Sequence, residues 1–167
     1  MLKRIIIVAA AAALASTAVA QEGPGTKFRR LYINMAKADF ELAGPPSGMS
    51  MEVAEDNADG LSYRLKKGET LCGVVDFGKN RERIAALTFA QCYFEADGME
   101  FAKFTRALTD NYGLKQVSCR PDPSSPARTV CEGGASTGER IHISSSSGLI
   151  VTRTEVQKPG SVVGKFD

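Results

Sequence analysis

The sequence has no tryptophan, one histidine, and no Cys-x-x-Cys spacing among its 167 residues. Most nucleophilic hydrolases activate a serine or cysteine with a neighbouring histidine, which leaves His142 as the one candidate for that role. Without Cys-x-x-Cys, the usual signatures of a thioredoxin-type redox site and of a zinc knuckle are missing. The sequence therefore indicates no cofactor and shows no recognisable catalytic signature.

An excess of charge of either sign is also missing. The chain has 21 Lys and Arg against 19 Asp and Glu, and Lys3 and Arg4 lie in a segment that we expect to be cleaved, which leaves 19 of each. A chain without an excess of positive charge is not expected to attract polyanions, so we expect no nucleic-acid partner.

The only long apolar run is at the N-terminus. Lys3 and Arg4 are followed by an apolar run over residues 5–14 and then by small residues that end at Ala20. This order is typical of a secretory signal peptide, so we expect cleavage after Ala20 and Gln21 as the first mature residue. The run is shorter than the roughly 20 residues that cross a bilayer. We expect no membrane span and, because the alanine-rich leader looks bacterial, a periplasmic or secreted protein.

The four cysteines are Cys72, Cys92, Cys119 and Cys131. An even number of cysteines in an exported chain favours two disulfides, for which three pairings exist. If the flanking strands form hairpins, the pairs are Cys72–Cys92 and Cys119–Cys131. The alternative is that one or both pairs are reduced and buried.

A helix is predicted over residues 98–112. Asp97 is the expected N-cap and Glu100 the returning partner of a capping box, while Gly113 supplies the left-handed stop. Apolar side chains recur every three or four residues on one face, namely Phe101, Phe104, Leu108 and Tyr112.

Strand-like segments lie on both sides of this helix. Turn residues separate them at 78–82, 121–126 and 133–138, and in the serine run that ends at Gly148. The predicted strands are 61–65, 70–77, 84–94, 114–120, 127–131, 140–145 and 149–156. Connections this short favour antiparallel pairing, so we expect an α+β fold with one or two helices packed on an antiparallel meander and stabilised by disulfides.

The first mature segment, residues 26–43, fits a helix face and also alternates as a strand would, and we favour the helix. Residues 44–48 end it because two prolines cannot continue a helix. Residues 56–60 are predicted to form a polar turn, and residues 158–167 a loose tail. We expect a single domain over residues 21–157, or two degenerate α–β units over about 26–96 and 97–157.

If the first segment is helical, the predicted order of elements is a helix, strands that contain one cysteine pair, a second helix, and strands that contain the other cysteine pair. This layout resembles that of secreted hydrolase inhibitors such as the β-lactamase inhibitory protein, and each half resembles the helix and meander of cystatins. The resemblance is one of layout, because no sequence motif of either family is present. It implies a binding role of the inhibitor kind.

Candidate catalytic and metal-binding residues are few. His142 lies between Ile141 and Ile143, so we expect an ordinary polar strand residue that faces solvent if the isoleucines are buried. The carboxylates Asp76, Glu95 and Asp97 near strand ends are expected to serve in caps and turns.

A copper(I) site is the remaining metal hypothesis. Met49 and Met51 offer two thioethers, and a third ligand could come from Met35, Met99 or His142. The competing interpretation, which we call the filler interpretation, is that these methionines fill gaps in the hydrophobic core.

Two functional hypotheses follow. The first is an exported, non-catalytic binding protein of the bacterial envelope, inhibitor-like, chaperone-like or structural. Its loops at 121–126 and 133–138 would contact another exported protein or an envelope component. The alternative is a small periplasmic enzyme or a copper-type metal-binding protein.

Overall fold

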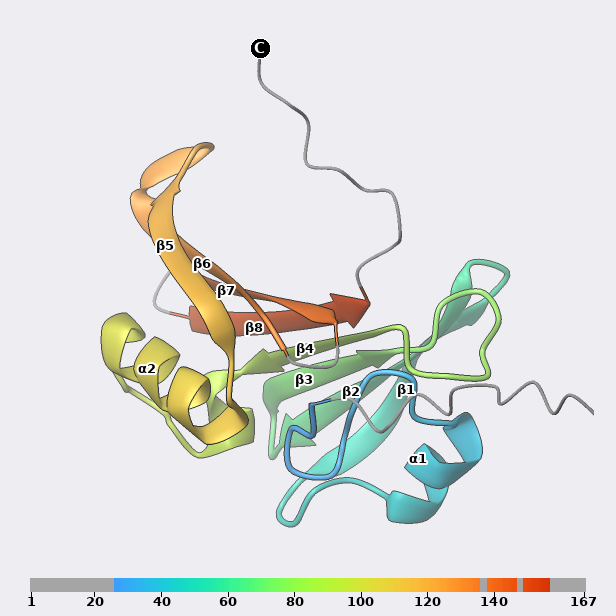
Figure 1. Ribbon diagram of the computed structural model, residues 1–167. Coiled ribbons are helices and arrows are strands. Elements are labelled where there is room, and N and C mark those ends of the chain that lie inside the picture. Colours follow the sequence, from blue (N-terminus) through green and yellow to red (C-terminus); the bar gives the residue numbers. More distant parts are fainter. Residues whose placement is uncertain (1–25, 136–137, 147–148, 157–167) are drawn as a thin grey trace, which may run out of the picture.

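The computed structural model describes residues 26–135, 138–146 and 149–156 (Figure 1). The predicted signal peptide and the predicted C-terminal tail lie outside these residues. In chain order the elements are α1 (Lys37–Ala43), β1 (Ser50–Asn57), β2 (Gly60–Lys67), β3 (Thr70–Asp76), β4 (Ala86–Ala90), η1 (Gln91–Phe94), α2 (Phe101–Tyr112), β5 (Lys115–Asp122), β6 (Ser125–Gly134), β7 (Glu139–Ser146) and β8 (Leu149–Val156).

All eight strands form one antiparallel sheet in the order β1-β2-β3-β4-β8-β7-β6-β5. Each half of the chain contributes one helix followed by a four-stranded meander, and the halves join where β4 pairs with β8. Both helices lie against the same face of the sheet (Figure 1). The predicted α+β class with an antiparallel meander is confirmed.

The core lies between the sheet and the layer that contains the helices. Residues 26–36 run through this layer between α1 and α2 (Figure 1). Phe28 is fully buried there, with ring centroids 4.9 Å from Tyr112 and 5.9 Å from Phe89. The segment therefore acts as a third covering element beside the two helices.

Residues 26–36 are not helical, so the favoured helix over 26–43 is wrong for its first part. Arg29 and Asn34 have φ of 60° and 74°, which an α-helix does not accommodate. Phe28 and Leu31 pair in an isolated bridge across Arg29 and Arg30. Ile33 and Met35 are also buried, so the alternating pattern is the one that the core uses.

The helix after the first meander is confirmed, but it begins later than predicted. The N-cap is Glu100, which makes no side-chain capping hydrogen bond, so the predicted Asp97–Glu100 capping box is wrong. Gly98 has a φ of 74° and Met99 N donates to Ala96 O, which makes residues 96–99 a turn before the helix. At the other end, Gly113 adopts the left-handed conformation as predicted.

The predicted strand over residues 84–94 is correct only for residues 86–90. β4 ends at Ala90, and η1 follows. Tertiary contacts fix this turn: Gln91 Nε2 donates to Met99 O at 2.7 Å, and the Tyr93 hydroxyl donates to Phe28 O at 2.8 Å. Tyr93 also stacks on Phe89 with centroids 3.8 Å apart.

Three further differences concern turns and edges. β1 was not predicted, and it forms the outermost strand of its half. The proline-rich stretch 121–126 belongs mostly to β5 and β6, with Asp122 paired to Ser125. Gly133 and Gly134, expected in a loop, close β6.

Both predicted disulfides are present, Cys72–Cys92 and Cys119–Cys131. The first ties β3 to η1 inside the core, and the second ties β5 to β6. Among the described residues, no helix is long and apolar enough to cross a membrane.

Candidate functional site

The two faces of the sheet differ sharply, and the strand register shows how. One row of Cα partners crosses seven strands, from β1 to β6 in sheet order, and consists of Val53, Tyr63, Val75, Leu87, Thr154, Ile141 and Gly133. The five residues from β2 to β7 are buried. Val53 at the edge is exposed, and Gly133 is half-buried. Because adjacent strand residues point to opposite faces, the neighbouring row lies on the other side. That side carries neither helix (Figure 1).

We call this second side the open face. Its row runs through Glu52, Arg64, Val74, Thr88, the backbone of Arg153, His142, Glu132 and Ser118. Glu52, Arg64 and Ser118 are exposed, whereas Val74, Thr88, Glu132 and His142 are half-buried. Charged and polar groups thus outnumber the one apolar side chain among these residues.

Ion pairs order part of the open face. Lys66 Nζ lies 2.7 Å from Glu52 Oε1 in the first half of the sheet. In the second half, Glu132 Oε1 lies 3.6 Å from both Arg120 Nη2 and His142 Nδ1. Exposed ion pairs of this kind contribute little to stability, so their main effect is to set where charge is displayed.

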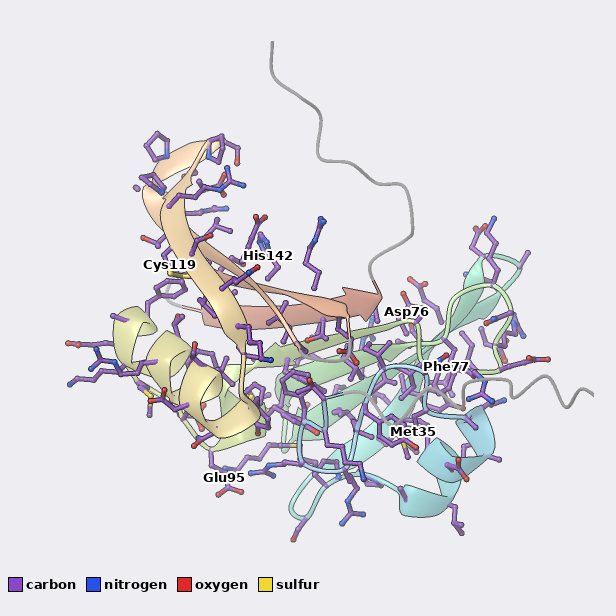
Figure 2. All side chains as sticks on the ribbon, viewed as in Figure 1. Met35, Asp76, Phe77, Glu95, Cys119 and His142 are labelled. Carbon is purple, nitrogen blue, oxygen red and sulfur yellow. A yellow bond between two sulfur atoms is a disulfide. The ribbon has the colours of Figure 1, made fainter. Side chains whose placement is uncertain are left out.

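His142 lies where the sequence predicted. Ile141 and Ile143 are buried on the helix side, and His142 points from β7 to the open face (Figure 2). Among the described residues, His142 lies close to Glu132 and makes no hydrogen bond with a serine or cysteine that could act as a nucleophile. The group resembles a surface charge network and not a catalytic triad.

The variant His142→Ala is expected to fold normally, with a free energy of unfolding within about 0.5 kcal/mol of the parent, as is usual for half-exposed strand residues. Urea unfolding would measure this quantity. An activity that disappeared in this variant, with the fold intact, would contradict a non-catalytic role.

His142 lies far from the other candidate ligands of the methionine-based copper site. Met51 is in β1 and His142 in β7, five positions apart in the sheet, which at about 4.8 Å per strand is about 24 Å. Met35 is buried on the helix side, whereas His142 projects from the other face (Figure 2). Met49 packs against the hydrophobic core, as the filler interpretation predicts. Among the described residues, no three His, Cys, Asp or Glu side chains cluster as metal ligands.

The candidate carboxylates serve local structure. Asp76 Oδ1 accepts a hydrogen bond from Gly78 N at 2.8 Å in the β3–β4 turn. Glu95 Oε1 accepts one from Arg29 Nη2 at 2.6 Å, which ties η1 to the covering segment 26–36. Asp97 is exposed in the turn before α2. These contacts fit turn and cross-link roles.

Two carboxylates, those of Glu95 and Asp122, make stability depend on acid pH. The hydrogen bond from Arg29 lowers the pKa of Glu95 below its ordinary value of 4.5, and hydrogen bonds from Ser124 lower the pKa of Asp122 below 3.8. Each group therefore stabilises the fold above its ordinary pKa, and this contribution is lost as the pH falls below it. We expect the urea concentration at the unfolding midpoint to decrease as the pH is lowered below about 4.5. The substitution Glu95→Gln is expected to weaken this pH dependence. Equal pH profiles for the two proteins would exclude the Arg29–Glu95 contribution.

Sequence reasoning missed most of the open face. Arg64, Thr88 and Glu132 occupy polar positions in alternating strands, which is the signal that could have marked them as sharing a side with His142. The register between strands far apart in the chain was needed to place them in one row. With this geometry in place, the comparisons give no relative: no protein-family model, curated protein or solved structure matches the chain.

Proposed function

We propose that this protein is exported, loses residues 1–20, and acts as a non-catalytic binding protein of the bacterial envelope. It holds another exported protein, or an envelope component, against the open face of its sheet. One observation carries the proposal: one face of the sheet is filled by helices and core, whereas the polar row of the open face has no helix over it and holds ion pairs at Glu52 and Glu132.

The rigidity of the sheet supports this role. Each strand of the row, except the edge strands β1 and β5, is hydrogen-bonded on both sides. Binding to a surface that is already ordered avoids much of the entropy cost of fixing loops and side chains. The charges Glu52, Arg64 and Glu132 would then give the partner its orientation more than its affinity.

Export can be tested by intact mass. Protein purified from the envelope of its host is expected to begin at Gln21 and to weigh four hydrogens less than the reduced mature chain. A mass that retains residues 1–20, or four free thiols, would contradict an exported, disulfide-tied protein.

Binding can be tested with a photoreactive amino acid in place of Arg64, which is exposed on the open face. Irradiation of host cells is expected to give one main adduct, whose second protein or envelope component is identified by mass spectrometry. The matched control has the same group in place of Lys103 on α2, where the side chain is 75% exposed. Equal labelling from both positions, or none from Arg64, would contradict binding at the open face.

A further inference from the structure

The distal part of the β5–β6 hairpin stands apart from the rest of the molecule. It projects beyond the sheet and away from both helices (Figure 1). From Ser118 to Thr129 every residue is exposed except Asp122 and Ser125, which are half-buried. We call these twelve residues, 118–129, the distal hairpin.

Both faces of the distal hairpin are free. Ser118 is the Cα partner of Glu132 and belongs to the side of the open face. Thr129 is two residues from Cys131, so both belong to the opposite side, on which Ile143, the partner of Cys131, is buried. Ser118 and Thr129 are both exposed. A flat partner would cover one face of such a ribbon, and only a cleft covers both.

The distal hairpin is also fixed in shape. The Cys119–Cys131 disulfide closes its base. At the tip, Asp122 Oδ1 accepts hydrogen bonds from Ser124 N at 2.8 Å and from Ser124 Oγ at 2.7 Å. Pro121, Pro123 and Pro126 restrict the backbone further. A pre-shaped ribbon loses little conformational entropy on insertion.

The charge of the distal hairpin is positive. Its charged residues are Arg120, Asp122 and Arg128, and the Asp122 carboxylate is already engaged by Ser124. Arg128 forms no ion pair with a described residue, although its charge, after the hydrogen bonds from Ser124, helps to lower the pKa of Asp122. Arg120 lies 3.6 Å from Glu132. Guanidinium groups form their best contacts with carboxylates and phosphates, often in pairs of hydrogen bonds, and a protein cleft supplies carboxylates.

We infer that the distal hairpin inserts into a cleft of another exported protein, and that carboxylates line this cleft opposite Arg120 and Arg128. The inference rests on the proposed binding function and specifies the partner as a protein with a concave acidic site. The open face then contacts the rim of the same partner.

The test places the photoreactive amino acid singly at Ser118, Ser124 and Thr129 in the full chain, alongside the Arg64 and Lys103 positions above. We expect adducts with one and the same protein from all three hairpin positions, on peptides of that protein that contain Asp or Glu. Adding Arg128→Glu to the Ser124 probe is expected to reduce adduct yield about tenfold, because like charges repel at the interface. Lys103→Glu is the matched control and is expected to leave the yield unchanged.

The outcomes separate the two proposals. Adducts from Arg64 without adducts from the hairpin would overturn the insertion and leave the binding function standing. Labelling from Ser118 or Thr129 alone would indicate a flat contact and contradict a cleft. A yield insensitive to Arg128→Glu would contradict the acidic lining. The absence of adducts at every position would overturn both proposals.

Discussion

Replacing Phe28 with alanine is expected to lower the free energy of unfolding by about 3–5 kcal/mol, the range for deleting a buried aromatic side chain. Phe28 is fully buried and contacts rings from three other elements, Phe89 in β4, Phe94 in η1 and Tyr112 in α2. Its loss would leave a cavity where the covering segment, the sheet and α2 meet. Urea denaturation followed by far-UV circular dichroism would measure the change.

The control for Phe28→Ala is Tyr32→Ala in the same segment. Tyr32 is only half-buried, so we expect a loss of about 1 kcal/mol. The hydrogen bond from Tyr93 to the Phe28 carbonyl is retained in both variants, because it involves the main chain. Equal effects of the two substitutions would show that residues 26–36 do not pack under the sheet as described.

The second large effect is expected from the double variant Cys72→Ala, Cys92→Ala. The disulfide closes a loop with a sequence separation of 20, and its removal is expected to cost about 3 kcal/mol through the entropy of the unfolded chain. Both cysteines are buried in the core, so lost packing adds to this cost. The variant is therefore expected to unfold at a clearly lower urea concentration than the parent.

The matched control is Cys119→Ala, Cys131→Ala, which opens a loop with a sequence separation of 12. Cys119 is exposed, so less packing is lost, and we expect a smaller decrease in stability. Dithiothreitol should lower the unfolding midpoint of the parent toward that of the double variants. A parent whose midpoint is unaffected by full reduction would contradict a stabilising role for either bond.

Local signals in the sequence predicted much of the fold. The spacing of Phe101, Phe104 and Leu108, with Gly113 after them, identified α2 because both its apolar face and its end depend on nearby residues. Hairpin geometry selected both cysteine pairs for the same reason: strands joined by a short turn are neighbours in the sheet.

The wrong predictions concern segments whose structure depends on contacts with residues far away in the chain. The apolar residues of 26–36 fit two periodicities, and the turn at Arg29 is fixed by Glu95 and Tyr93, far along the chain. β1 lacked a recognisable strand pattern because an edge strand is largely exposed, and it carries Glu52, Glu55 and Asp56. Charges on edge strands are common, since they discourage pairing with other chains.

The candidate surface was predictable only in part. Alternation placed His142 opposite the buried isoleucines, a local inference that was correct. The open face also needs Thr88 and His142 on neighbouring sides of β8. This depends on the pairing of β4 with β8, which are separated by about half of the described chain. No residue pattern near either strand specifies that pairing.

The position of β8 has a consequence for the order of assembly. It is the last described strand in sequence but lies in the middle of the sheet, between β4 and β7. A chain that emerges N-terminus first can form two separate meanders, each with an unpaired inner edge, until residues 149–156 arrive to join them. Such open edges are sites of aggregation. A chain that ends before residue 149 would keep the unpaired edges of β4 and β7 permanently. Whether β8 is intact therefore decides whether the product is one sheet or two smaller sheets that are prone to aggregate.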